Sequence, residues 1–530
     1  MNMFPTTGGL VLDYEQLMLT KTDYSFYQFY ELLDKIRPAV YTVNELAERT
    51  EMSYQKTYNM VQDINQQVQA YLPEQKSFLT EHGGVDTRKL FVSLDRYRFE
   101  IIQANLPFKL LWYMLTTENP TIEIFCKDND VSKSTVFRKL KLFNDFLKRF
   151  KLHMRYKNLA IVGDERYTRL VLYQVMRITA REQSINIFPP ELREEVQQVH
   201  NLIFQNIDVF EELHDTEDID FVVAIFLLRE HHGFYVNNDS RYQALTAENP
   251  NYNIDVLAPM LDVPENRLAG ELNFAFFLLN YPPIFRDANS NFLQRTLRFY
   301  SRTENIIWSL VTDCLKVIQH NDFNDEVDLT QDRLLLGNLL NTTLGSYILR
   351  GPFPAFTYVP INDSVLRFGK NKLYLDIDYY FNHLPQNFRA FSSVKDQLIN
   401  AFYQFIMRNY VSYDKNYQLK IGLYMEESNL TYQDYRDLLN GIPYFKVAPY
   451  FTKFAEQYDV VVTTSASLYR KHAQRGNYFF FDVETSDILG GLYQQLQTYY
   501  AKHILGGHLK NSTSASKTKP AGQDDTSSEN

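Results

Sequence analysis

Hydrophobic and polar positions repeat between two stretches of the chain that lie 79 positions apart. In each stretch a capping residue precedes a short apolar pattern. A second capping residue then precedes a longer stripe with the helical spacing i, i+4, i+7, i+11. The first copy comprises Thr42, Val43, Leu46, Ala47, Met52, Ser53, Thr57, Val61, Ile64 and Val68. The second comprises Thr121, Ile122, Phe125, Cys126, Val131, Ser132, Val136, Leu140, Phe143 and Leu147.

Each copy therefore predicts a short helix, a tight turn and a second helix. Thr42 and Thr121 can cap the first helix through their hydroxyl groups, and Ser53 and Ser132 can cap the second. A preceding helix repeats at the same offset, so the unit is expected to contain three helices. This is the arrangement that places one helix of a helix-turn-helix unit in a DNA groove.

The two second helices differ on their exposed faces. Between Lys127 and Lys157 there are ten Lys or Arg and three Asp or Glu, an excess of seven positive charges. Because phosphate contacts supply affinity and base-edge contacts supply sequence preference, the second copy is expected to contribute more of the affinity. A β-hairpin wing is predicted after each copy, over residues 78–92 and 152–162. The expected DNA contacts are Ser53, Tyr54, Gln55, Lys56, Tyr58, Asn59, Arg88, Lys89, Ser132, Lys133, Ser134, Thr135, Phe137, Arg138, Lys141, Arg155 and Lys157.

Composition and charge refine this prediction. The 530 residues carry a net charge of −10, but residues 1–165 hold 21 basic and 21 acidic side chains, so the excess of acid lies beyond them. A single basic helix is often only a solvated face, whereas two copies with matched caps favour DNA binding. The two cysteines predict neither a disulfide framework nor a metal site. No signal peptide or membrane span is expected, so the protein is predicted to be cytoplasmic.

After residue 165 the pattern predicts long helices and then a small α/β domain. The expected helices are 167–181, 190–205, 218–231, 267–279, 296–319, 329–350 and 393–408. Strands are expected at 419–424, 444–447, 459–464 and 478–483, alternating with helices at 432–440, 451–457 and 486–503. This alternation predicts a parallel sheet. Residues 506–530 are rich in Ser, Thr, Lys and Asp and are predicted to be disordered.

The order of these parts resembles the Mga/AtxA family of bacterial transcription regulators. The resemblance rests on the tandem winged helix-turn-helix pattern and on the junction from Asn158 to Glu165, which is followed by Arg166 and Arg169. It also includes the two helical blocks and the C-terminal α/β block, and it covers about residues 20–505.

The resemblance implies two helical domains of the PRD type, which the sugar phosphotransferase system can phosphorylate on histidine. The candidate acceptors are His200 and His383, with His214, His231, His232 and His320 as further candidates. Phosphorylation adds nearly two negative charges and could act as a switch; a helical surface histidine is more often without such a role. The C-terminal block resembles an EIIB domain, but the loop after its first strand, residues 425–429, contains no cysteine. We therefore expect self-association rather than phosphoryl transfer.

The predicted fold class is a mostly α multidomain protein with a C-terminal parallel sheet. The predicted domains are two winged helix-turn-helix domains (1–100 and 101–165), two PRD-like bundles (166–285 and 286–410), an EIIB-like domain (411–505) and the tail (506–530). The expected function is a regulator, an activator by resemblance, that binds double-stranded promoter DNA as a homodimer or higher oligomer. A phosphocarrier protein and RNA polymerase are further expected partners; no cofactor or catalytic residue is expected. The alternatives are a phosphotransferase component and an RNA-binding antiterminator.

Overall fold

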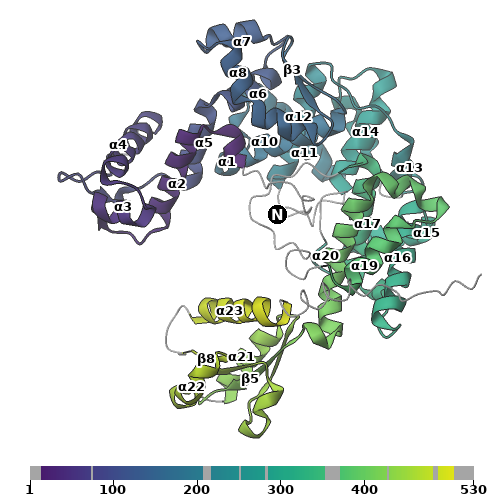
Figure 1. Cartoon of the computed structure of the whole chain (residues 1–530). Coiled ribbons are helices and arrows are strands. Elements are labelled where there is room, and N and C mark those ends of the chain that lie inside the picture. The colour runs from purple at the N-terminus through teal and green to yellow at the C-terminus, as the bar shows by residue number, and fades with distance from the viewer. Residues whose placement is uncertain are drawn as a thin grey trace, which may run out of the picture. The chain divides into compact units, whose positions relative to one another are not determined.

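The computed structural model describes residues 14–72, 76–206, 216–249, 252–280, 285–351, 370–426, 429–481 and 488–505. The chain divides into two compact units, and Figure 1 labels their helices and strands. One comprises Met1–Ile284, Ser290–Thr303 and Leu344–Pro360, and the other comprises Phe285–Asn289, Glu304–Thr343 and Ile361–Asn530. Within the described ranges, no helix combines the length and apolar character that a bilayer crossing requires.

The N-terminal part of the first unit contains both copies of the repeat. The first copy and its flanks are α1 (Tyr14–Met18), α2 (Lys21–Lys35), β1 (Val40–Tyr41), α3 (Val43–Thr50), α4 (Tyr54–Tyr71), β2 (Val85–Asp86), the 3₁₀ helix η1 (Thr87–Lys89) and α5 (Leu94–Ala104). The second copy is α6 (Leu106–Thr116), α7 (Ile122–Asp128), α8 (Lys133–Lys139), α9 (Lys141–Lys148), β3 (His153–Arg155) and β4 (Ala160–Val162). Both predicted stripes are buried, including Val61 and Ile64 in α4 and Phe143 and Leu147 in α9.

The rest of the first unit is helical. Its elements are α10 (Glu165–Ala180), η2 (Arg181–Ile187), α11 (Pro190–Asn206), α12 (Thr216–His231), η4 (Ser240–Tyr242), α13 (Gln243–Thr246), η5 (Ile254–Met260), α14 (Glu265–Asn280) and α15 (Asn291–Thr303). The last six residues of α17 (Arg333–Leu349), from Leu344 on, also lie in this unit. Helix α10 contacts α12, and α12 contacts α11. A cavity of about 40 Å³ lies among α11, α12, η5 and α14, and its lining is entirely apolar.

The second unit begins with a helical part. It contains α16 (Ile306–Phe323), η6 (Leu329–Gln331), most of α17, α19 (Lys372–Asn382), η7 (Gln386–Val394), α20 (Lys395–Tyr413) and η8 (Lys415–Tyr417). The prediction of one helix over residues 296–319 was wrong. Glu304 adopts a left-handed conformation (φ 43°), and the Asn305 side chain accepts hydrogen bonds from the N–H groups of Ile307 and Trp308 at 3.0 and 3.2 Å. These two residues end α15 and cap α16. The predicted break at residues 281–283 lies outside the described residues.

The C-terminal part of the second unit is a four-stranded parallel sheet, which confirms the predicted fold class. Its elements are β5 (Leu419–Tyr424), α21 (Asn429–Asn440), β6 (Phe445–Pro449), η9 (Thr452–Gln457), β7 (Val460–Thr463), α22 (Ala466–His472), η10 (Ala473–Arg475), β8 (Tyr478–Phe480), α23 (Ile488–Tyr499) and the π-helix η11 (Tyr500–Leu505). The strand order is β6-β5-β7-β8, and Ile421 of the central β5 pairs with Val447 and Val460. The sequence did not predict α22, and the helix expected at 451–457 is a short 3₁₀ helix.

Candidate nucleic-acid interface

The first helix-turn-helix is formed by α3 and α4, and the expected side chains cap both helices. The Thr42 hydroxyl accepts a hydrogen bond from the Glu45 N–H at 3.2 Å, and the Glu45 carboxylate accepts one from the Thr42 N–H at 2.7 Å, which forms a capping box. The hydrogen bonds that the Thr42 N–H and hydroxyl donate to this carboxylate lower the pKa of Glu45. The Ser53 hydroxyl accepts from the Lys56 N–H at the start of α4.

The second helix-turn-helix repeats the N-cap hydrogen bonds and the turn of the first, but not its capping box, because Ile124 stands at the position of Glu45. The Thr121 hydroxyl accepts from the Ile124 N–H, and the Ser132 hydroxyl accepts from the Thr135 N–H at 3.2 Å. In the two turns, the N–H groups of Met52 and Val131 donate to the carbonyls of Ala47 and Cys126, at 3.1 and 3.0 Å. The residues before them, Glu51 and Asp130, are both left-handed, with φ of 54° and 50°. These acidic turn residues, again 79 positions apart, were missed because glycine is the usual signal for this conformation.

The exposed face of α4 is polar and aromatic. Among the predicted contacts, Tyr54, Gln55, Lys56, Tyr58 and Asn59 are all exposed. The rings of Tyr54 and Tyr58 are stacked with centroids 6.3 Å apart. The Gln55 amide donates to the Asn59 side-chain oxygen at 2.9 Å. One basic residue, Lys56, and one acidic residue, Asp63, are the only charged side chains in this helix.

The corresponding face of the second winged helix-turn-helix is basic. Residues 133–148 contain five Lys or Arg and one Asp, and Arg138 and Lys141 are exposed. Lys133 forms an ion pair with Glu123, and the hydrogen bond from Lys133 lowers the pKa of that carboxyl. Phe137, which is 41% exposed, contacts the ring of Tyr156 in the wing, with centroids 4.4 Å apart.

The second winged helix-turn-helix departs from the prediction in one respect, because its second helix is not continuous. Leu140 has φ −88° and ψ 0°, which divides α8 from α9. The hydrogen bonds from the Leu140 N–H to the Val136 carbonyl and from the Asn144 N–H to the Leu140 carbonyl persist. The helix is thus locally distorted at Leu140, while the predicted apolar stripe stays buried on both sides of the break.

The second wing is the predicted antiparallel hairpin. Its strands β3 and β4 pair His153 with Val162, and the exposed Arg155 and Lys157 lie at the end of β3 and in the turn. Gly163 follows β4 with φ of 146°, and a Cβ there would meet the Leu152 side chain at 2.4 Å. Glycine is therefore required at this position.

The first wing differs from its prediction in how the strands pair. Strand β2 pairs with β1, which precedes α3, and Val85 forms a bridge with Leu79 across the Gly83–Gly84 turn. Arg88 and Lys89 lie beyond this turn in η1 and not in the hairpin. The Arg88 guanidinium donates to the Asp86 carboxylate at 2.8 and 3.1 Å, and these hydrogen bonds lower the pKa of Asp86.

The candidate histidines lie in two different environments. The His200 Nδ1 atom is 2.6 Å from the Asp220 carboxylate, and the ring stacks on Phe204. His383 ends α19, where its Nδ1 lies 2.8 Å from the Tyr379 carbonyl and its ring stacks on the Tyr379 ring.

The further candidates also differ among themselves. His231 and His320 lie near Glu195 and Asp325. Burial, followed by the charge of Arg229, lowers the pKa of His232. His214 lies outside the described residues.

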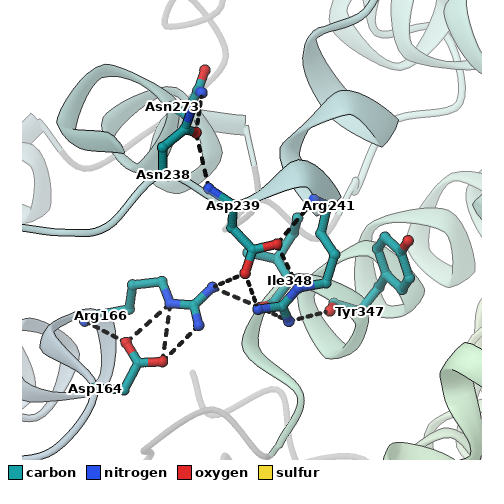
Figure 2. Close-up of polar contacts among 8 residues, drawn as sticks. All are labelled: Asp164, Arg166, Asn238, Asp239, Arg241, Asn273, Tyr347 and Ile348. Atoms are coloured by element: carbon teal, nitrogen blue, oxygen red, sulfur yellow. Dashed lines mark hydrogen bonds and ion pairs between the residues drawn. The ribbon is translucent and has the colours of Figure 1, made fainter. Parts of the chain in front are cut away.

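Sequence reasoning missed a polar cluster at the start of α10, directly after the second wing (Figure 2). The Asp164 side chain caps α10 and accepts hydrogen bonds from Arg166. Arg166 and Arg241 both donate to the Ile348 carbonyl, at 3.0 and 2.6 Å, near the end of α17. Asp239 pairs with Arg241, and hydrogen bonds from Arg241 lower the Asp239 pKa to about 2. The cluster joins the exit of the winged unit to a loop and to the last turn of α17.

A second missed cluster joins the other end of α10 to α5, the helix that connects the two winged units. Arg98 is fully buried; it donates to the Glu15 carboxylate at 2.5 Å and to the Ile178 carbonyl at 2.8 Å. Arg181, directly after α10, forms an ion pair with Asp95 of α5. The signal that could have found this cluster is an arginine in the apolar sequence around Phe99 and Ile101.

The described structure and its two capped units define a multidomain helix-turn-helix protein. Residues 91–175 match the Mga helix-turn-helix domain. A stretch of 186 residues is 22% identical to the capsule synthesis positive regulator AcpB of Bacillus anthracis, covering 33% of this chain and 38% of that protein. Together, the two matches confirm the resemblance to the Mga family. The chain thus spans less than two thirds of the relative that it matches.

Proposed function

We propose that the protein is a Mga-type transcriptional regulator that binds double-stranded promoter DNA through its two winged units. The match to the Mga helix-turn-helix domain supports this proposal. The observation that carries it is the exposed basic face of α8 and α9, which occurs in the second of two helix-turn-helix units with the same caps and turn. A basic helix beside a basic wing is complementary to the phosphates that flank a major groove.

The test is duplex binding by the full chain, measured by fluorescence anisotropy over a range of NaCl concentrations. Replacing both Arg138 and Lys141 with Ala should weaken binding and reduce the salt slope by about 2, because each phosphate contact contributes about 0.9. Lys109→Ala, an exposed lysine on α6, is the matched control and should leave the slope unchanged. A structured RNA competitor that displaces the duplex at equal concentration would instead indicate an antiterminator.

We further propose that the C-terminal domain serves self-association, so that the DNA-binding protein is a homodimer or a larger oligomer. Leu430 and Leu438 of α21 are 77% and 52% exposed, and Phe451, after β6 in the same domain, is 57% exposed. In an oligomer several copies would contact the same DNA, and this multivalent binding would raise the overall affinity. Replacing Leu430 and Leu438 with Ser should shift the full chain toward monomer in sedimentation equilibrium.

We also propose that the helical blocks sense carbohydrate status through phosphorylation of His200 or His383 by a phosphocarrier protein. A phosphoryl group on His200 Nδ1 would displace the Asp220 carboxylate and be repelled by it, which would push α11 and α12 apart. His200→Ala and His200→Asp should therefore give different transcription when the sugar supply changes. The same output from both variants would count against this role.

Activation, rather than repression, is proposed from the name of the similar protein, a positive regulator. An activator of this kind would contact RNA polymerase and act in the cytoplasm as a regulator and not as an enzyme. Mapping of bound DNA across the genome, combined with transcript levels after deletion, tests the sign of regulation at each promoter.

A further inference from the structure

The two DNA-facing helices present different chemistry at equivalent positions of the repeat. In α4 the first exposed turns carry stacked tyrosines and a pair of amides, with Lys56 as the only cation. In α8 and α9 the same region carries hydroxyls and cations. Since both helices follow the same serine cap and turn, and the backbone break at Leu140 comes only after the first turns, the difference there lies in the exposed side chains. Each helix is thus suited to a different part of a duplex.

The amides of α4 can read base edges. Gln55 and Asn59 lie one turn apart in the N-terminal half of the helix, which is the part that reaches the bases in helix-turn-helix complexes. A Gln or Asn amide donates one hydrogen bond and accepts another, which matches N7 and the 6-amino group of adenine in the major groove. The hydrogen bond between the two amides, at 2.9 Å, orients both side chains along the same exposed face.

The tyrosines beside the amides supply apolar contact. Tyr54 is 52% exposed and Tyr58 is 37% exposed, and their rings lie nearly parallel, with an interplanar angle of 16°. In the major groove an apolar surface distinguishes thymine, which carries the 5-methyl group. An adenine-reading amide next to a methyl-contacting ring is complementary to A·T base pairs.

The second winged unit has less capacity for base readout than the first winged unit. Lys133 is paired with Glu123, and Phe137 lies against Tyr156 of the wing. Arg138 lies at the position of the repeat equivalent to Asn59, and Lys141 lies three residues beyond it. The exposed Lys148 pairs with Asp145. We assign the free cations to phosphates on the ground of charge, because phosphates attract cations without regard to base sequence; an arginine that read a base edge would instead pair with guanine.

We propose that the two winged units divide DNA recognition. The first unit reads A·T base pairs in the major groove through Gln55, Asn59, Tyr54 and Tyr58, and the second unit binds phosphates. This inference rests on the proposed function, since it requires that the protein bind duplex DNA.

The experiment is selection of bound sequences from a randomised duplex pool by the full-length protein. The wild type should enrich a motif with A·T pairs under the first unit. The double variant Q55A/N59A should lose that part of the motif, lowering the preference for the selected sequence over the unselected pool by about 10-fold or more. Its affinity for the unselected pool and its salt slope should stay the same. The variant R138A/K141A should bind all sequences more weakly and keep the motif.

Gln66→Ala is the matched control, because Gln66 is an exposed amide on the same helix, about two turns beyond Asn59. It should leave both motif and affinity unchanged, and circular dichroism of each variant verifies the fold. If the wild type binds no duplex at low salt, the proposed function fails. If the wild type selects a motif and Q55A/N59A selects the same one equally well, the division of recognition is overturned while the proposed function stands. If Q55A/N59A lost the same amount of affinity for every DNA sequence, the division of recognition would also be overturned.

Discussion

Glu230 in α12 offers a direct test of the electrostatics of the first helical block. Its side chain is buried, and neither carboxyl oxygen has a hydrogen-bond partner among the described residues. Next to it lies Glu271, whose carboxylate is held by Arg169 through two hydrogen bonds of 2.6 and 2.9 Å. Burial, followed by the negative charge of Glu271, raises the pKa of Glu230 from 4.5 to about 8. Glu230 is therefore neutral at pH 7 in the folded protein.

The raised pKa makes stability depend on pH in a defined direction. Between about pH 4.5 and 8 the folded state binds a proton at Glu230 that the unfolded state has released, so stability falls as the pH rises. Below pH 4.5 Glu230 is protonated in both the folded and the unfolded state, so none of this stability is lost. One pKa unit corresponds to about 1.4 kcal/mol, so the loss up to pH 8 is at most about 5 kcal/mol.

The variant Glu230→Gln removes this dependence, since a neutral amide of the same shape does not titrate. The readout is amide hydrogen exchange of α12 and α14 peptides in the full chain at pH 5 and pH 8, corrected for the intrinsic exchange rate. This measures the local opening free energy in a protein with several domains. At pH 8 the variant should be more protected by about 2 kcal/mol or more, and near pH 5 the two proteins should converge.

Glu194→Gln, an exposed acid on α11, is the control and should follow the wild type at both pH values. Equal protection of wild type and Glu230→Gln at pH 8 would refute the reasoning, because it would mean that Glu230 is ionised and stabilised in place. Lower protection in the variant at both pH values would do the same, by assigning Glu230 a hydrogen-bonding role that the charge argument omits.

Three further predictions concern packing and backbone. Arg98→Met removes the 2.5 Å ion pair of the buried Glu15, whose longer ion pair with Arg181 at 3.8 Å remains, and should destabilise the fold by about 3 kcal/mol in urea unfolding; a change below about 1 kcal/mol would contradict the buried pair. Val223→Ile adds a methylene to the apolar cavity and should stabilise the protein by up to about 0.8 kcal/mol, whereas Val171→Ile, at a buried position outside the cavity, should be destabilising in the same thermal melts. Gly163→Ala should cost about 1–3 kcal/mol because of its φ of 146° and the Leu152 contact; an unchanged melting temperature would exclude that strain.

The sequence predicted the features that depend on neighbouring residues. The caps at Thr42 and Ser53 and their repeats could be predicted, because a capping side chain bonds to a backbone group only two or three positions away. Strand β5 was predicted with its observed bounds, since a strongly apolar strand between turn residues carries its own signal.

The features that the sequence did not predict depend on distant partners or on local strain. The partners of Arg98 and of Arg241 lie 83 and 107 positions away, respectively, and no local pattern specifies such a pairing. The break between α15 and α16 was missed because Glu304, which is neither Gly nor Pro, takes the left-handed conformation. Leu140 interrupts its helix within an unbroken apolar stripe, so periodicity alone could not reveal it.

The length of α10 has a consequence for which changes in chain length the fold tolerates. Its 16 residues form a rod about 24 Å long, anchored near one end by Arg166 and at the other by the Ile178 carbonyl that accepts from Arg98. Deleting a single residue from its middle would turn one anchor by about 100° relative to the other. The two anchors could then no longer be formed at the same time. An insertion or deletion within α10 is therefore excluded unless it adds or removes whole helical turns.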